Sequence, residues 1–223
     1  MKTLLYSICT ISILLAGCQG NSQTQDQKNT TQQNQDIAPV QTKPINGLER
    51  AYFASGCFWC VEAIYESVKG VEEVISGYSG GHTENPTYES SNTGRTGHAE
   101  AIEVLYDPKT ISFSTLVDVY FGSQNPTQIN GQGPDIGSQY RSIIFFQNQS
   151  QKNIIQKKKD FLSKTLNRKI AAEVTSFQKF WKAEDYHQDY EKRNPYNRYI
   201  QNISIPRLKR FHKKFPELIK DTH

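Results

Sequence analysis

The sequence predicts an α+β fold, a two-layer sandwich in which helices pack on a sheet built around a split βαβ core. Length and composition give the first support, because 223 residues suit one domain, and 36% hydrophobic with 22% charged residues is typical of a globular chain. Periodicity gives the second, since strand-like and helix-like patterns alternate from residue 48 onward. Collagen-like and fully disordered chains are thereby excluded.

The first half of this region begins with a strand, expected over residues 48–55 and ended by Gly56. Apolar residues at helical spacing then predict a helix over 57–68. Gly70 stops that helix, and a second strand is expected over 71–78.

The middle part contains two polar loops rich in turn-forming residues, over 79–97 and 122–139. Between them, an alternating pattern predicts a strand over 99–106, which stops before an Asp-Pro pair. A helix is expected over 113–121.

The last expected elements are a strand over 141–146, a basic amphipathic helix over 149–166 and a strand over 169–175. The order β-α-β-β-α-β-α-β indicates a split βαβ core of the ferredoxin-like type that carries long loops.

Residues 1–17 are expected to be an export signal. Lys2 gives the positive start, and the apolar run over residues 4–16 is too short to span a bilayer as a mature helix. Leu-Ala-Gly-Cys at residues 15–18 resembles the lipobox of bacterial lipoproteins. This resemblance implies that Cys18 is lipidated and that the exported protein is anchored to a membrane of the cell envelope. An ordinary secretory signal is the alternative.

Residues 18–47 are expected to form a disordered tether, and residues 48–223 the globular domain with a basic tail. Residues 19–36 contain no aliphatic or aromatic side chain, and 14 of these 18 residues are Gln, Asn, Thr or Ser. Such a segment cannot bury enough apolar surface to offset the entropy of ordering it.

The charge balance excludes some partners. A net charge of +4 is too mild to indicate a nucleic-acid partner. The basic residues 157–159 and the tail 207–214 are interpreted as solvated faces, with a membrane surface or an acidic partner as the less favoured interpretation. We expect a monomer.

The cysteines narrow the chemistry. Of the four, Cys9 lies in the expected signal and Cys18 at the expected lipidation site, so Cys57 and Cys60 are the thiols left in the domain. A disulfide between residues three apart constrains almost no chain entropy, so a structural role explains the pair poorly. A zinc site needs two further ligands, and the five histidines contain no H-x3-5-H pair. No metal is therefore expected.

Redox chemistry fits the pair better. Cys57 follows a glycine where a strand is expected to turn into a helix, and the helix dipole there is expected to lower its pKa. Cys60, one turn later, is placed to attack the sulfur species that forms on Cys57. A C-x-x-C pair by itself fits simple thiol–disulfide exchange equally well.

The residues around the pair are more specific. Gly-Cys-Phe-Trp-Cys-Val-Glu at residues 56–62 resembles the active-site signature of the methionine sulfoxide reductase A family. Further blocks follow in the family's order at residues 77–81, 85–88, 96–101, 106–108, 135–142 and 183–188. The resemblance covers roughly residues 49–194.

This resemblance implies thiol-dependent reduction of methionine S-sulfoxide, free or in proteins, which repairs oxidative damage. It makes Cys57 the nucleophile that attacks the sulfur and Glu100 the acid that protonates the oxygen. The apolar neighbours of Glu100 are expected to raise its pKa and keep it protonated. Tyr88 and Tyr140 match the phenols that hydrogen-bond the sulfoxide oxygen.

Four further residues carry over from the resemblance. Phe58 and Trp59 match the pocket that receives the methyl group of the substrate. Asp135 matches a loop aspartate that supports the oxygen-binding network, and His187 a histidine that lines the substrate groove. The alternatives are a turn residue for Asp135 and a histidine on a helix face for His187.

The implied reaction leaves a sulfenic acid on Cys57, which Cys60 converts into a Cys57–Cys60 disulfide and water. Many relatives resolve with a distant C-terminal cysteine, which this sequence lacks beyond Cys60. No bound cofactor is expected, and thioredoxin or a thioredoxin-like protein is the implied external reductant.

Two other functions stay open. An exported C-x-x-C thiol–disulfide oxidoreductase shares Cys57 and Cys60 but has no use for Glu100, Tyr88 and Tyr140. A lipoprotein that binds oxidised peptides without turnover is the third possibility.

Overall fold

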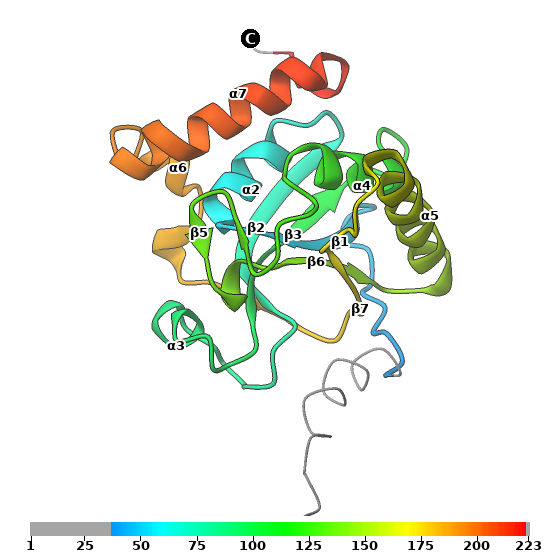
Figure 1. Cartoon of the computed structure of the whole chain (residues 1–223), viewed down its shortest axis with the longest axis horizontal. Coiled ribbons are helices and arrows are strands. Elements are labelled where there is room, and N and C mark those ends of the chain that lie inside the picture. The colour runs from blue at the N-terminus through cyan, green and yellow to red at the C-terminus, as the bar shows by residue number, and fades with distance from the viewer. Residues whose placement is uncertain (1–36, 222–223) are drawn as a thin grey trace, which may run out of the picture.

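The structure, a computed structural model, describes residues 37–221, which are the coloured part of Figure 1. The expected export signal, the lipidation site Cys18 and residues 19–36 of the expected tether lie outside these residues.

A six-stranded sheet forms the centre, in the order β7-β6-β1-β3-β2-β8. Neighbouring strands are antiparallel except for the parallel pair β6 and β7. The strands are β1 (Glu49–Ser55), β2 (Val71–Ser79), β3 (Ala99–Tyr106), β6 (Ser142–Phe146), β7 (Glu173–Ser176) and β8 (Phe180–Lys182).

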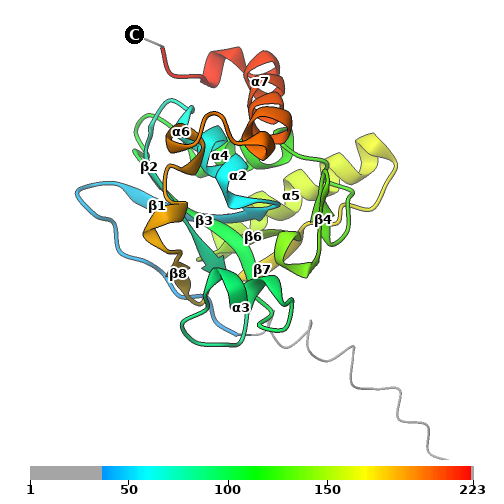
Figure 2. The same cartoon turned by 90° about the vertical axis from the view of Figure 1, so that its left-hand side faces the viewer.

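The inner four strands, in the order β6-β1-β3-β2, are joined by α2 (Phe58–Glu66) after β1 and α4 (Phe113–Gly122) after β3. This is the split βαβ arrangement, so the expected two-layer α+β fold is confirmed. Figure 2 shows α2 and α4 on one face of the sheet, together with α5 (Gln149–Leu166), and α7 (Ile205–Lys214) over α2 on the side away from the sheet.

Short elements fill the connections. They are α3 (Tyr88–Asn92), β4 (Gly131–Gln132), β5 (Asp135–Ile136), η1 (Ser138–Tyr140), η2 (Asp185–His187), α6 (Tyr190–Arg193), η3 (Ile200–Ser204) and η4 (Pro216–Leu218).

Strand β3 is buried along its whole length because both faces of the sheet are covered. Ile102 and Val104 pack in the main core with the helices, whereas Ala99 and Ala101 pack in a second cluster on the opposite face. Side chains alternate along a strand, so Glu100 lies on the helix face with Ile102. The pleat thus points this carboxyl toward the layer that contains α2.

Several boundaries differ from expectation. The first polar loop contains α3, because Thr87 and Ser90 form a capping box that starts a helix there. The second contains the β4-β5 pair. The last expected strand, over 169–175, is β7 at Glu173–Ser176, and the elements β8, α6 and α7 were not expected from periodicity.

Residues 37–47 lie against the domain, which corrects the expected extent of the tether. The Val40 N–H donates to the Phe177 carbonyl at 2.8 Å, and the Thr42 N–H donates to Gln147 Oε1 at 2.8 Å. Gln147 in turn donates to the Arg50 carbonyl at 2.6 Å. The polar composition alone did not reveal these long-range bonds.

Within residues 37–221, no helix has the length and apolar character needed to cross a membrane.

Candidate active site

The turn from β1 into α2 places both cysteines. Gly56 adopts φ +85°, and Cys57 is the N-cap residue of α2. A Cβ atom on Gly56 would lie 2.6 Å from Cβ of Gln132, so this turn requires glycine for both its backbone angle and its space. Cys60 follows one helical turn later, and both thiols are free and buried.

Glu100 reaches the start of the same helix. Its Oε2 accepts a hydrogen bond from the Phe58 N–H at 3.0 Å, and the residue is 2% exposed. Burial raises the pKa of Glu100 to about 8, and the nearby Asp135 and Cys60 charges add to the shift. The raised pKa agrees with the expected protonated carboxyl, which lies next to Phe58, the residue that follows Cys57.

The two thiols differ from expectation in which one ionises first. Burial raises the pKa of Cys57. The hydrogen bond from the Cys57 thiol lowers the pKa of Cys60 to about 6, and the positive charge of Arg207 acts in the same direction. The expected lowering of the Cys57 pKa is thus not found in the reduced pair, where burial and the neighbouring Cys60 raise it.

Tyr199 joins Asp135 to the thiols. Its hydroxyl donates to Asp135 Oδ2 at 2.6 Å and lies 3.6 Å from Cys60 Sγ. Asp135, in β5, is therefore connected to Cys60 through this phenol. Tyr199 precedes η3, and nothing in the sequence distinguished it from the other eleven tyrosines.

The two expected phenols lie near Glu100 and Cys57. Burial raises the pKa of both Tyr88 and Tyr140, and negative charge on Glu100 or Cys57 raises each pKa further. Tyr140 Oη donates to Asn92 Oδ1 at 3.5 Å. Both phenols are thus protonated donors at neutral pH, within electrostatic reach of Cys57.

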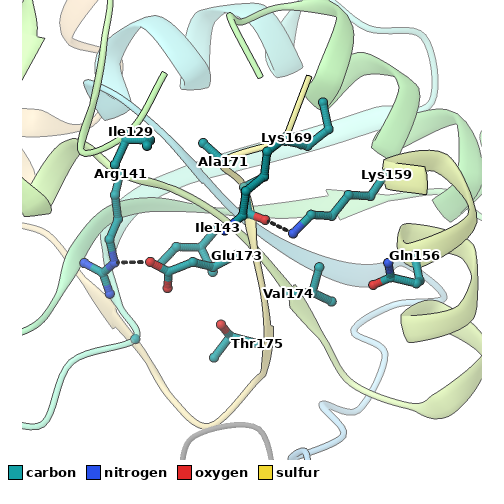
Figure 3. Close-up of a pocket in the computed structure, with 13 residues that line it drawn as sticks. Ile129, Arg141, Ile143, Gln156, Lys159, Lys169, Ala171, Glu173, Val174 and Thr175 are labelled. Atoms are coloured by element: carbon teal, nitrogen blue, oxygen red, sulfur yellow. Dashed lines mark hydrogen bonds and ion pairs between the residues drawn. The ribbon is translucent and has the colours of Figure 1, made fainter. Parts of the chain in front are cut away.

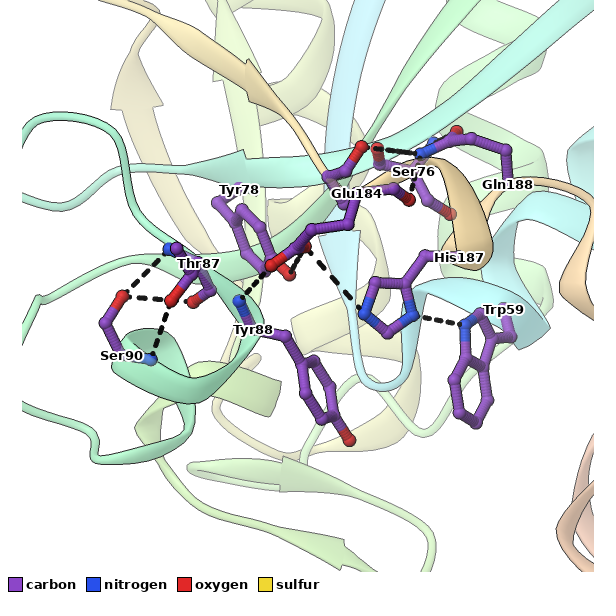
Figure 4. Close-up of polar contacts among 10 residues, drawn as sticks. Trp59, Ser76, Tyr78, Thr87, Tyr88, Ser90, Glu184, His187 and Gln188 are labelled. Atoms are coloured by element: carbon purple, nitrogen blue, oxygen red, sulfur yellow. Dashed lines mark hydrogen bonds and ion pairs between the residues drawn. The ribbon is translucent and has the colours of Figure 1, made fainter.

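Aromatic side chains gather around His187, and Figure 4 shows Trp59 and Tyr88 beside it. The centroid of its ring lies 4.9 Å from that of Phe58, 5.7 Å from that of Trp59 and 4.7 Å from that of Tyr88. Trp59 also stacks on Tyr190 at 3.8 Å. His187 is 1% exposed, so its ring packs against these aromatic rings and is almost inaccessible to solvent.

Glu184 fixes two of the neighbouring tyrosines (Figure 4). It accepts hydrogen bonds from the Tyr88 N–H at 2.9 Å and from the Tyr78 hydroxyl at 3.0 Å. Its Oε2 lies 3.9 Å from Nε2 of His187. Glu184 lies in the 183–188 block of the resemblance, but nothing in the sequence indicated its role. Its hydrogen-bond partners, Tyr78 and Tyr88, are 106 and 96 positions away in the chain.

Arg207 corrects the interpretation of the tail as a solvated face. It is 8% exposed, and its guanidinium donates to the Ser123 carbonyl at 2.9 Å and the Ser55 carbonyl at 3.1 Å. Within the described residues, no carboxylate lies within ion-pair distance of it. A buried, unpaired cation thus lies beside the start of α2.

Two cavities of the domain are large enough to be candidate sites. One, of about 410 Å³, lies at the sheet edge beside β7, and the thiols do not line it. There Lys159 donates to the Ala172 carbonyl and Arg141 pairs with Glu173 at 3.2 Å (Figure 3). The other, of about 590 Å³, has Cys60 and Asp135 in its wall. We call this second cavity the Cys60 recess.

The arrangement supports chemistry at sulfur and oxygen. It combines a thiol pair with one ionised sulfur, a protonated carboxyl and two phenol donors. A nucleophile at sulfur and an acid at oxygen are what reduction of a sulfoxide needs. In the part of the chain that the structure describes, no group of three or more His, Cys, Asp or Glu residues is placed to hold a metal ion.

Comparison with known proteins agrees with this chemistry. The family model described as peptide methionine sulfoxide reductase matches residues 49–219. The peptide methionine sulfoxide reductase MsrA of Pasteurella multocida is 46% identical over 77% of this chain and 99% of its own length. The MsrA of Saccharolobus solfataricus is 42% identical over 78% of this chain and 98% of its own length.

Solved structures agree as well. Methionine sulfoxide reductase A of Corynebacterium diphtheriae aligns with a TM-score of 0.62 at 32% identity, over 74% of this chain and 88% of its own. The reduced form of Mxr1 from Saccharomyces cerevisiae aligns with a TM-score of 0.65 at 31% identity, over 72% of this chain and 93% of its own. The chain therefore belongs to the peptide methionine sulfoxide reductase A family and is an enzyme of the peptide-methionine (S)-S-oxide reductase class.

Proposed function

We propose that Cys57 attacks the sulfur of a methionine S-sulfoxide while Glu100 protonates its oxygen. The observation that carries this proposal is the 3.0 Å bond from the Phe58 N–H to Glu100 Oε2. It holds the carboxyl beside the nucleophile and leaves its other oxygen free to carry the proton. With a pKa of about 8, Glu100 is protonated at neutral pH. Transfer of the shared proton from Cys57 to Cys60, along the hydrogen bond between them, makes Cys57 the thiolate that attacks.

Tyr88 and Tyr140 steady the oxygen as charge develops on it. Phe58 and Trp59 receive the methyl group, with His187 supporting both rings. Methionine leaves, and Cys57 remains as a sulfenic acid.

Resolution falls to Cys60. It lies one helical turn from Cys57 and shares a hydrogen bond with it, so its thiolate is placed to attack the sulfenic sulfur. Water leaves and the Cys57–Cys60 disulfide forms. Over the cycle two thiols are oxidised and one sulfoxide is reduced. Thioredoxin or a thioredoxin-like protein then reduces the disulfide.

A single-turnover assay without reductant tests this sequence of steps. The full-length chain carries Cys9→Ser and Cys18→Ser, so that thiol counts report on Cys57 and Cys60 alone. It is reduced, mixed with a peptide containing S-methionine sulfoxide, and analysed for methionine and remaining thiols. We expect one methionine and the loss of two thiols. In Cys60→Ser we expect one methionine and a sulfenic acid that a dimedone probe traps.

Two other results of this assay would contradict the proposal in different ways. If no methionine forms while the thiols still exchange with an added disulfide, the protein is an oxidoreductase of the simple C-x-x-C kind and the proposed reaction is wrong. If methionine forms with the loss of one thiol in the chain that retains Cys60, the reductase stands and Cys60 is not the resolving residue.

We also propose that the protein is an exported lipoprotein whose first mature residue is Cys18. The lipobox-like Leu-Ala-Gly-Cys and the polar residues 19–36 support this. Mass analysis of the N-terminus from membrane fractions tests it. We expect an acylated peptide starting at Cys18, and loss of membrane association in Cys18→Ala.

A further inference from the structure

The Cys60 recess reaches the thiol pair at Cys60. It lies between α7 and the segment from Gly122 to Asp135, and Cys60 forms part of its wall. Cys57, Glu100, Tyr88 and Tyr140 do not line it. The mechanism proposed above uses those four residues, so it leaves the recess without a function.

The recess is positively charged. Arg207, Arg210 and Lys214 line it, against a single carboxylate, Asp135. That carboxylate already accepts the Tyr199 hydroxyl at 2.6 Å. The other lining residues are mostly uncharged amides and small residues of 122–134. A concave site with an excess of one sign of charge raises the local concentration of oppositely charged solutes.

The recess also restricts the size of a reactant. Cys60 is 2% exposed, so a nucleophile has to enter the cavity to reach its sulfur. A volume of about 590 Å³ lies in the range of small-molecule sites. A small thiol fits this access better than a thiol held on the surface of another protein.

We propose that the recess admits low-molecular-weight thiols that carry a carboxylate, and that these reduce the Cys57–Cys60 disulfide by attack on Cys60. This inference rests on the proposed function, which forms the disulfide, and adds a second class of reductant to the thioredoxin-like protein. The carboxylate of the small thiol lies against Arg210 and Lys214 at the exposed rim, and Arg207 lies deeper.

The chemistry balances with two equivalents of the small thiol. The first thiolate attacks Cys60 Sγ, a new S–S bond forms, and the Cys57–Cys60 bond breaks with its electron pair going to Cys57. The second thiolate attacks the mixed disulfide at the sulfur of the first thiol, which releases the oxidised small disulfide and the Cys60 thiolate. Two protons from the two small thiols restore the two protein thiols.

Alkylation of single thiols tests the charge preference without any turnover. The full-length chain carries Cys9→Ser and Cys18→Ser, with either Cys57→Ser or Cys60→Ser added. For each remaining thiol, the rate with iodoacetate is divided by the rate with iodoacetamide. This ratio cancels the ionised fraction of the thiol and reports on the preference for an anion. We expect the ratio at Cys60 to exceed the ratio at Cys57 by about tenfold at low salt.

Two double variants of α7 distinguish an effect of the cations that line the recess from an effect of the overall charge of the helix. Arg210→Gln with Lys214→Gln removes two cations of the rim, and we expect the ratio at Cys60 to fall toward that of free cysteine. Lys209→Gln with Lys213→Gln removes two exposed cations of the same helix that do not line the recess, and we expect the ratio to stay high. If both pairs lower it equally, or neither does, the recess is not the anion site.

Salt provides a second measurement that needs no α7 substitution. The Debye length falls to about 3 Å in 1 M salt, so the preference at Cys60 should largely disappear there. An unchanged ratio overturns the proposal.

Turnover then tests the reductant role in the chain that retains both thiols. The pre-formed disulfide is reduced with 3-mercaptopropionate, 2-mercaptoethanol or cysteamine, and each rate is corrected for the thiolate fraction and nucleophilicity of the reagent. We expect the corrected rate to be highest with the anionic thiol, lower with the neutral thiol and lowest with the cationic thiol. The anionic thiol should react about tenfold faster than the neutral one. Equal corrected rates overturn the inference about the recess. If the single turnover still yields methionine, the proposed function stands. If no methionine forms, the proposed function itself is overturned.

Discussion

The Trp59 indole N–H donates to Nδ1 of His187 at 3.1 Å, and this bond fixes the imidazole in its neutral form with the proton on Nε2. Burial lowers the pKa of His187, which agrees with a neutral ring. Nε2 then points toward Glu184 Oε2 at 3.9 Å (Figure 4). The histidine therefore orients the indole that we assign to the methyl pocket, and it does not transfer protons.

Replacing this histidine should impair substrate binding more than chemistry. In His187→Ala we expect KM to rise about tenfold with a smaller change in kcat, because Trp59 loses its acceptor and the ring behind it. Steady-state kinetics give the separate changes in KM and kcat. The fluorescence emission of Trp59, measured in a chain that also carries Trp181→Phe, reports the altered environment of the indole. His82→Ala, which removes a histidine of the first polar loop, serves as the control. An equal fall in kcat with KM unchanged would contradict the positioning role.

Replacing Glu100, the proposed acid, should slow sulfoxide reduction strongly and leave thiol exchange intact. In Glu100→Gln we expect the single-turnover rate of methionine formation to fall by about 10²–10⁴-fold, the usual range for a general acid. Exchange of the thiols with an added disulfide should persist, since that reaction needs no proton at oxygen. Glu103→Gln, on the opposite face of the same strand, is the matched control and should keep its activity.

The pH profile of the single turnover should be bell-shaped. Glu100 has a raised pKa of about 8, so its protonated, active form is present below pH 8 and is lost above it. Cys60 has a lowered pKa of about 6, so the pair lacks a thiolate below pH 6. The rate of methionine formation should therefore be highest between about pH 6 and 8. In Glu100→Gln the residual rate should lose its alkaline limb, and persistence of that limb would assign it to another group.

The stability of the fold should also depend on buried carboxyls. Burial raises the pKa of Glu62 to about 7, while its oxygens accept the Asp189 N–H and the Ser76 hydroxyl, each at 3.0 Å. A folded-state pKa above the unfolded value near 4.5 stabilises the protein below pH 4.5, and this stability is lost as the pH rises through about 7. Glu62→Gln should flatten the fall in Tm over that interval. A Tm that rises across it would show that other groups dominate.

The buried cation should control ionisation of the thiol pair. In Arg207→Gln we expect the first thiol to ionise about one pH unit higher, because the positive charge that lowers the pKa of Cys60 is gone. The thiolate absorbance in the ultraviolet, followed against pH, measures this. Lys209→Gln on the same helix should leave the titration unchanged. Loss of the two bonds to the Ser55 and Ser123 carbonyls should also cost about 1–3 kcal/mol of unfolding free energy.

The turn before Cys57 should tolerate no side chain. Gly56→Ala combines a positive φ with a contact of 2.6 Å to Gln132, whereas Gly133→Ala has a positive φ of +60° and open space around it. We expect Gly133→Ala to cost about 1–2 kcal/mol from backbone strain, and Gly56→Ala to cost more. Denaturant unfolding of both variants makes the comparison. Equal losses would mean that the contact with Gln132 relaxes freely.

The sequence by itself determined the order of the main elements and the chemistry of the central site. Periodicity located the four core strands and the helices α2, α4 and α5, because apolar spacing depends on neighbouring residues alone. The signature around Cys57 predicted the redox pair, and the resemblance singled out Glu100. The apolar neighbours of Glu100 predicted a raised pKa, which agrees with the burial of its carboxyl.

The tertiary structure decided what depends on contacts between distant segments. Tyr199 reaches Asp135 across 64 positions and Cys60 across 139, and Arg207 reaches Ser55 across 152. Such distances leave no periodic signal, so the sequence did not distinguish Tyr199 from other tyrosines and assigned Arg207 to a solvated tail. A pKa depends on burial and on the charges nearby in space. The Cys57 thiol, which lowers the pKa of Cys60 most, is near Cys60 in the sequence, but only the folded chain brings the positive charge of Arg207 close to it.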